Sequence, residues 1–170
     1  KIIILSKKEK YKNLVAYSSI NNFLRSKKIL APKYYMHDFS KGILVIEDFG
    51  EDSFYKLLLK KKNKFKLYKE LVNLLLKIQK IKPKYKTKNI EKGFHFIEKY
   101  SKKNLFKESN LFFDWYLPLF LSKKKASSIK AKSKKILSKL YSRINFSNNC
   151  FVHRDYHAQN LMKKGNKVGL

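Results

Sequence analysis

The amino-acid sequence predicts an α+β fold, with a small mixed half followed by a mostly helical half. Three observations predict it. The first half combines a short apolar run, one helical pattern and one hairpin pattern. From Phe54 onward, apolar residues recur mainly at three- and four-residue steps. Short strand patterns return only near the end of the 170 residues, and a hydrophobic content of 44% suffices for one domain of ordinary size.

The elements of the first half follow from short local patterns. Residues 2–5 are isoleucines and a leucine, a run that favours a buried strand. Residues 11–28 place apolar side chains near helical spacing and predict a helix, which a proline ends. Residues 33–37 and 43–47 are two strand candidates. The segment between them contains Gly42, a residue that hairpin turns favour, so the two strands should pair.

The second half is predicted to be mainly helical. Residues 54–81 form one long amphipathic pattern with lysines on the outer faces. Further helices are predicted at residues 94–103, 111–121 and 126–144, and short strands at 150–152 and 166–170. A boundary is expected at the acidic residues 47–52, so that residues 1–50 form one lobe and residues 51–170 the other.

The charge is strongly basic, with 41 basic against 12 acidic residues and a net charge of +29. Such a balance raises nucleic acid as a partner, because lysine and arginine neutralise phosphates. Here, however, 38 of the basic residues are lysine and only Arg25, Arg143 and Arg154 supply the planar guanidinium that suits phosphates and guanine edges. We therefore interpret the charge as a bias of the whole surface and expect no specific nucleic-acid partner.

Several other classes are disfavoured. No apolar run approaches the roughly 18 residues that a membrane span needs. Cys150 is the only cysteine, which excludes an internal disulfide and a cysteine-based zinc site and fits a cytoplasmic setting. We expect a monomer. The chain begins at Lys1 beside a strand pattern and stops at Leu170 within an apolar stretch, so we expect it to be part of a longer protein.

One segment, residues 151–162, carries a chemical pattern. It reads H-x-D-x-x-x-x-N through His153, Asp155 and Asn160, with apolar residues on both sides. In phosphoryl transfer, a protein must aim a hydroxyl at the γ-phosphate and neutralise charge with a metal ion. Asp155 can accept the hydroxyl proton, and Asn160 can offer an amide oxygen to Mg²⁺. His153 is expected to brace the loop by hydrogen bonding.

This segment, V-H-R-D-Y-H-A-Q-N-L-M, resembles the catalytic loop shared by protein kinases and by the aminoglycoside phosphotransferase and choline kinase group, and is most similar to the latter. Residues 44–52, L-V-I-E-D-F-G-E-D, resemble the hinge of that group. Residues 108–117, E-S-N-L-F-F-D-W-Y-L, resemble a helix of its bacterial cell-wall sugar kinases. Those enzymes phosphorylate the anomeric hydroxyl of N-acetylmuramate or N-acetylglucosamine in peptidoglycan recycling.

The resemblance implies a protein-kinase-like two-lobed fold, with an incomplete small lobe joined to a helical lobe. It also implies ATP and Mg²⁺ as cofactors and an amino sugar as the small-molecule substrate. Backbone groups around Glu47 and Phe49 would contact the adenine. Asp155 and His153 would be the catalytic-loop residues, and Asn160 would be a metal ligand.

The sequence also departs from the family pattern. Its five glycines form no G-x-G phosphate loop, and no lysine near the first strand follows the V-A-I-K pattern. The second metal-binding aspartate should come just after Leu170. Since Mg²⁺ binds mainly through carboxylates and phosphates, Asn160 alone would hold it poorly. We therefore predict that the 170 residues alone do not turn over substrate.

Three alternatives stay open at this stage. If residues 153–157 formed a strand, His153, Asp155 and His157 would share one face and could bind Zn²⁺ as in a metal-dependent hydrolase. The chain could instead be a lysine-rich module that binds RNA or anionic lipid without catalysis. Lastly, His153, Arg154 and Asp155 could form only a structural network in an inactive relative.

Overall fold

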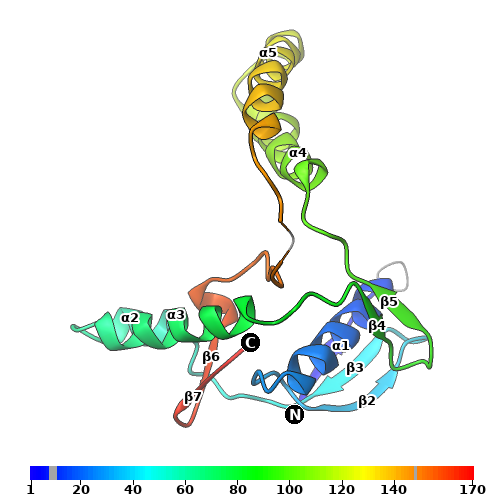
Figure 1. Cartoon of the computed structure of the whole chain (residues 1–170), viewed down its shortest axis with the longest axis vertical. Coiled ribbons are helices and arrows are strands. Elements are labelled where there is room, and N and C mark those ends of the chain that lie inside the picture. Colours follow the sequence, from blue (N-terminus) through cyan, green and yellow to red (C-terminus); the bar gives the residue numbers. More distant parts are fainter. Residues whose placement is uncertain (8–10, 148) are drawn as a thin grey trace. The chain divides into compact units, whose positions relative to one another are not determined.

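The structure is a computed structural model that describes residues 1–7, 11–147 and 149–170 (Figure 1). In these residues the chain has an α+β fold with five α-helices and three small antiparallel sheets. Two compact units are present. Unit 1 comprises Lys1–Ile97 and Asn149–Leu170, and unit 2 comprises Glu98–Asn148. The expected boundary after Gly50 lies within unit 1, and the division into two lobes at that point stays a prediction.

The first sheet has the order β1-β3-β2, with β1 at Ile2–Leu5, β2 at Tyr34–Asp38 and β3 at Ile43–Ile46. The β2–β3 hairpin confirms the predicted pairing, with Asp38 opposite Ile43. Gly42 has φ of 70°, and a Cβ atom there would lie 2.0 Å from the carbonyl oxygen of Ser6. Only glycine therefore fits this turn.

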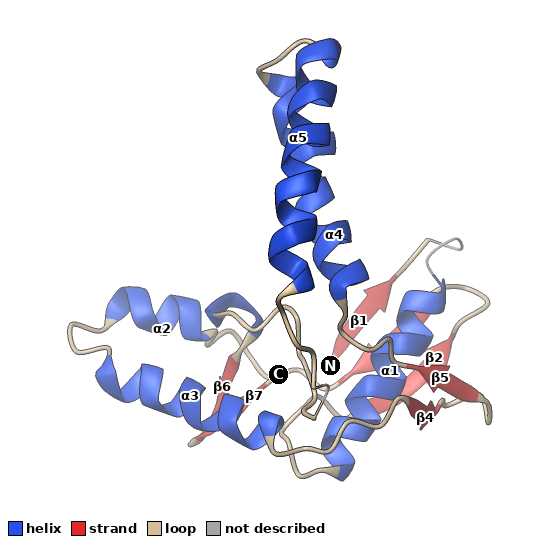
Figure 2. Ribbon diagram, turned by 45° about the horizontal axis from the view of Figure 1, so that its top comes forward, coloured by secondary structure: helices blue, strands red, loops and turns tan. Residues whose placement is uncertain are grey.

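Strand β1 is not the buried strand that its composition predicts. It lies at the edge of the sheet, and the exposed fractions of Ile3 and Leu5 are 64% and 74%. Helix α1, Tyr11–Ser26, confirms the predicted helix and packs on this sheet (Figure 2). Because α1 covers only one face, the side chains on the other face stay exposed. The shared core consists of Leu14, Val15, Phe39, Leu44 and Ile46.

The predicted single helix over residues 54–81 is two helices, α2 at Phe54–Lys60 and α3 at Phe65–Gln79. The break falls in a polar run in which the Asn63 side chain accepts a hydrogen bond from the Phe65 N–H at 3.0 Å. Asparagine favours such turns because its side chain competes for backbone groups. Ser53 caps α2 in the same way, by accepting from the Lys56 N–H at 3.2 Å.

The predicted helix over residues 94–103 is wrong over most of its length. Residues 94–96 form strand β5, Phe94–Phe96, which pairs with β4, Lys86–Lys88. The turn between them is organised by Asn89, whose side chain accepts from the Glu91 and Gly93 N–H groups at 3.0 and 2.8 Å. The alternation Phe-His-Phe is a two-residue period, which is typical of a strand.

Strands β6, Met162–Lys164, and β7, Lys167–Gly169, form a hairpin around Gly165, which has φ of 56°. The prediction at residues 166–170 is confirmed by β7. The predicted strand at 150–152 is absent, because no strand in the described residues pairs with that segment. Phe151 is nevertheless buried.

Unit 2 is built from α4, Lys102–Leu111, a π-helical turn at Phe112–Tyr116, a 3₁₀ turn at Leu117–Leu119, and α5, Lys123–Ser142. The helices predicted at 111–121 and 126–144 are confirmed in outline. The buried core of this unit is small and consists of Phe113, Leu117 and Ala126. None of the helices in the described part of the chain combines the length and the apolar character that a membrane crossing requires.

Candidate functional site

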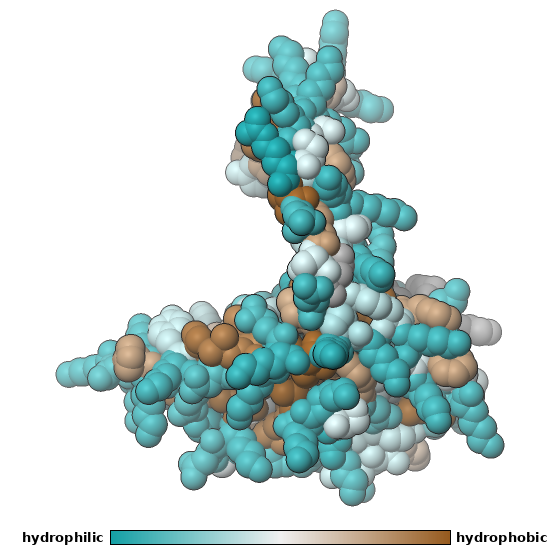
Figure 3. All heavy atoms as spheres, viewed as in Figure 1, coloured by the Kyte–Doolittle hydropathy of each residue, from teal (hydrophilic) through white to brown (hydrophobic). Residues whose placement is uncertain are grey.

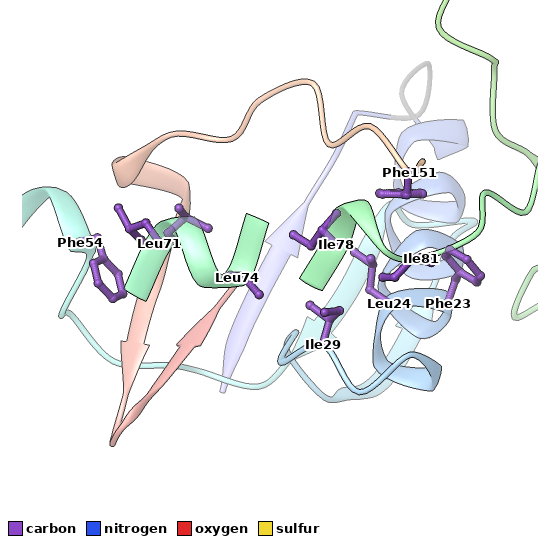
Figure 4. Close-up of a cluster of buried hydrophobic side chains, with 10 residues drawn as sticks. Phe23, Leu24, Ile29, Phe54, Leu71, Leu74, Ile78, Ile81 and Phe151 are labelled. Atoms are coloured by element: carbon purple, nitrogen blue, oxygen red, sulfur yellow. The ribbon is translucent and has the colours of Figure 1, made fainter. Parts of the chain in front are cut away.

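The segment with the H-x-D-x-x-x-x-N pattern is an irregular loop with buried ends. Phe151 and Leu161 belong to the main core of unit 1, and Leu161 is completely buried. Figure 4 shows Phe151 beside Phe23 and Ile81, and the chain that follows it passes over α3 toward β6. Burying two large apolar side chains contributes roughly 1.5–3 kcal/mol each. The loop is therefore fixed at both ends while its middle faces solvent.

Backbone hydrogen bonds attach the end of the loop to the start of α2. The Phe54 N–H donates to the Leu161 carbonyl at 2.8 Å, and the Lys163 N–H donates to the Asp52 carbonyl at 2.8 Å. Ser53 and Met162 form an isolated antiparallel bridge between them. The acidic segment at 47–52 and the loop, about a hundred residues apart in the sequence, are thus joined directly.

A second attachment comes from Tyr156 in the middle of the loop. Its hydroxyl donates a hydrogen bond to the carbonyl of Leu71 on α3 at 2.6 Å. Burial raises the pKa of this hydroxyl to about 12, so it stays protonated at neutral pH. The ring packs against the main core. Tyr156 therefore fixes the backbone on the C-terminal side of Asp155.

The structure brings Asp155 and Asn160 into direct contact. The amide nitrogen of Asn160 donates to the Oδ2 atom of Asp155 at 2.6 Å and to the Asp155 carbonyl at 3.1 Å. The Asp155 side chain is 71% exposed. Since the amide nitrogen is held by Asp155, the amide oxygen of Asn160 is the atom available to a cation.

His157 is a third member of this cluster. Its Nδ1 atom accepts from the Gln159 N–H at 3.3 Å, and its Nε2 atom lies 3.1 Å from the amide nitrogen of Asn160. That Nε2 atom lies 3.2 Å from the Oδ1 atom of Asp155 and can donate to it. The two oxygens of Asp155 are thus contacted by different partners, which fixes the plane of the carboxylate.

His153 is placed differently from the brace that the sequence predicts. Its Nδ1 atom is buried and has no hydrogen-bond partner among the described residues. The ring instead packs edge-on against Tyr156, with 5.6 Å between centroids. Burial lowers the pKa of His153, the negative charge of Asp155 acts in the opposite direction, and the neighbouring His157 lowers it. A neutral His153 therefore supports the loop by packing.

The backbone of the loop is strained at one position. Arg154 has φ of 70°, a left-handed conformation that side chains with a Cβ atom rarely adopt. Such strain costs about 1–3 kcal/mol and persists only where the surroundings impose it. The left-handed conformation of Arg154 turns the chain between the half-buried His153 and the exposed Asp155, so that these two side chains lie in different environments.

The two predicted nucleotide-contact residues lie against the β6–β7 hairpin. Glu47 forms an ion pair with Lys164, and its Oε2 atom accepts from the Lys33 N–H at 2.9 Å. The hydrogen bond from Lys164, followed by that from Lys33, lowers the pKa of Glu47. The Glu47 N–H donates to the Lys33 carbonyl at 2.7 Å. A contact between the Glu47 backbone and a nucleotide would therefore involve its carbonyl oxygen.

Phe49 is a buried member of this region. Its ring edge would lie 2.5 Å from a Cβ atom at Gly169, so glycine in β7 is what allows the close approach. The Lys164 ammonium lies over the ring at 4.8 Å from its centroid. Sequence reasoning missed Lys164, because nothing local distinguishes it from the other lysines. It likewise gave Tyr156 no role.

The alternating His153, Asp155 and His157 do not form a strand. Within residues 1–7, 11–147 and 149–170, no three His, Cys, Asp or Glu side chains gather closely enough to hold a metal ion. A zinc site is therefore not built here. A magnesium ion held by Asn160 would need most of its oxygen ligands from a bound phosphate, which fits the preference of Mg²⁺ for substrate phosphates.

Comparison with known proteins gives no functional assignment, so the interpretation of the site depends on the residues described above. No protein-family model matches the chain, and no curated protein matches it.

Proposed function

We propose that this chain carries the phosphoryl-transfer loop of an ATP-dependent kinase that acts on a small-molecule hydroxyl. The observation that carries the proposal is the contact between Asp155 and Asn160 on a loop whose two ends are buried. A carboxylate and an amide five residues apart, held together and facing solvent, are the two side chains that positioning a hydroxyl and a metal-bound phosphate requires.

In this proposal Asp155 orients the acceptor hydroxyl and takes up its proton. Its carboxylate is fixed in plane by Asn160 and faces His157, so little reorganisation is needed when a substrate arrives. Mg²⁺ bound with ATP would supply charge neutralisation at the transferred phosphoryl group. The Asn160 amide oxygen would be this loop's ligand to that ion.

The fold proposed for the whole protein is the two-lobed, protein-kinase-like fold of the aminoglycoside phosphotransferase and choline kinase group. The attachment of segment 52–54 to segment 161–163 supports this, because it joins a connecting segment to the catalytic loop. The Glu47 carbonyl and the Phe49 N–H would contact the adenine. We propose an amino sugar as substrate, and a cytoplasmic, monomeric protein.

The test is transfer of the γ-phosphate of ATP to N-acetylmuramate and to N-acetylglucosamine, measured on the full-length protein. Asp155→Asn is nearly isosteric and should reduce transfer by about a hundredfold or more, because proton acceptance is lost. Asp52→Asn changes another exposed carboxylate and is the matched control, with transfer expected to stay near the unmodified level. Undiminished turnover in Asp155→Asn would refute the role.

A further inference from the structure

A second feature of unit 1 lies away from the loop. A cavity of about 620 Å³ opens between the end of α1 with the residues that follow it, one face of α3, and residues 166–168 of the β6–β7 hairpin. None of His153, Asp155, Asn160, Glu47 and Phe49 lines it. Its volume is in the range of cavities that bind small molecules. The apolar part of its wall consists of Ile29, Leu30, Leu74 and Val168.

The polar part of the wall is strongly basic. The cationic side chains that line the cavity are Arg25, Lys28, Lys77 and Lys167. All four residues are exposed, whereas Ile29 and Leu74 are buried. The cavity therefore has an apolar floor and a cationic rim. Arg25 is also one of only three arginines in the chain, and the other three rim cations are lysines.

Most of the rim charge is not neutralised by neighbouring acids, although Arg25 interacts electrostatically with Glu47. Glu70 is the only carboxylate in the lining, and it forms an ion pair with Lys163, which does not line the cavity. Among the described residues, no carboxylate forms an ion pair with Lys28, Lys77 or Lys167. Cations of one sign gathered around a concave, partly apolar wall concentrate positive potential there, and an anion would relieve it.

We propose that this cavity binds a small organic anion, with a phosphate or carboxylate group on the rim and an apolar portion on the floor. Arg25 can contact the anionic group because, within the described part of the chain, its one side-chain hydrogen bond runs from Nη1 to the Ala31 carbonyl at 2.6 Å and leaves other guanidinium donors for a ligand. Asn73 and Asn166 line the same cavity and add amide donors. The inference does not depend on the proposed kinase activity.

Phenyl phosphate is a suitable probe, because it combines a phosphate with an apolar ring. Binding to the 170-residue chain is measured by calorimetry, and the amide NMR signals that shift are mapped. We expect shifts centred on Leu30, Leu74 and Val168, and weaker binding of inorganic phosphate, which lacks the ring. Shifts spread evenly over the lysines of α5, or no binding of phenyl phosphate at millimolar concentration, would overturn the proposal.

A pair of triple variants separates this cavity from the general charge. The first variant removes three rim charges by combining Lys28→Gln, Lys77→Gln and Lys167→Gln. It should bind phenyl phosphate about tenfold more weakly or worse. The control variant removes the same charge from exposed positions of α5 by combining Lys123→Gln, Lys124→Gln and Lys132→Gln. It should bind phenyl phosphate nearly as well as the unmodified chain. An equal loss in the two variants would show attraction by net charge alone and contradict the site. Shift mapping on the unmodified chain gives an independent answer if a variant fails to fold.

Discussion

Units 1 and 2 share one surface bias but differ in the size of their buried cores. Unit 2 contains twelve lysines and one arginine against three acids, and its buried core has only three members. The main core of unit 1 has ten buried members. Carboxylates have particular partners in both units, such as Lys164 for Glu47 in unit 1 and Asn104 for Glu98 in unit 2. Figure 3 shows hydrophilic side chains over most of the visible face of both units. Surface charge alone therefore does not distinguish the two units, whereas the extent of the buried core does.

The largest effect should come from the buried end of the loop. Leu161→Ala leaves a cavity at a completely buried position and should lower the free energy of unfolding by about 2–5 kcal/mol. Leu119→Ala in unit 2, where the side chain is 75% exposed, should change it by less than about 0.5 kcal/mol. Urea denaturation of both variants measures the difference. Equal losses would contradict the contrast between a loop fixed in the core and a solvated surface.

A smaller effect is expected from the middle of the loop. Tyr156→Phe removes the hydrogen bond to the Leu71 carbonyl and should destabilise unit 1 by about 1 kcal/mol. Hydrogen exchange of residues 153–160 should become faster in the variant. Tyr55→Phe alters an exposed tyrosine and serves as the control. If loop exchange were the same in both variants, the attachment to α3 would have no role in ordering the loop.

The stability of unit 1 should also depend on pH through His153. Burial lowers its pKa below the ordinary value of 6.5, so the unfolded chain binds the proton more readily than the folded chain. Stability should therefore be highest above pH 6.5 and fall as the pH drops through that value. His95, whose pKa burial also lowers, contributes in the same direction.

The contribution of His153 can be isolated by the difference between the unmodified chain and His153→Gln. The stability of the variant should depend less on pH between about pH 6.5 and 5 than that of the unmodified chain. This range lies above the pH at which Glu47 is protonated. Thermal unfolding across this range provides the measurement. An unchanged slope in the variant would show that His153 is not the buried neutral base described above.

The smallest effect is expected for the ion pair between Asp114 and Lys130 in unit 2, both of which are partly exposed. Asp114→Asn should cost less than about 0.5 kcal/mol, because solvent and salt screen such pairs. Comparing unfolding in low and high salt would check this. A loss as large as that of Leu161→Ala would contradict the small contribution expected of an exposed ion pair.

Local signals explain which parts could be predicted. The β2–β3 hairpin and helices α1 and α5 follow from turn residues and apolar spacing, which lie within a few positions of each other. The break at Asn63 and the strand at 94–96 were missed because short polar turns there override the helical spacing.

The candidate site divides in the same way. Asp155 and Asn160 could be chosen from the sequence because they lie five residues apart in one pattern. Their supports could not, since the Tyr156–Leu71 and Lys164–Glu47 contacts span 85 and 117 positions. No sequence periodicity connects residues so far apart. Nothing in the sequence around Lys164 distinguishes it from the other 37 lysines or indicates that it contacts Glu47.

The most direct measurement places a metal-bound nucleotide on the chain. Mn²⁺ with ATP is titrated into the isotope-labelled protein, and paramagnetic broadening of the amide NMR signals is followed. If the loop binds the metal and phosphates, signals of residues 155–160 should broaden first, and Asp155→Asn combined with Asn160→Ala should abolish this order. Broadening that starts at the lysines of α5 and is unaffected by those substitutions would contradict the account.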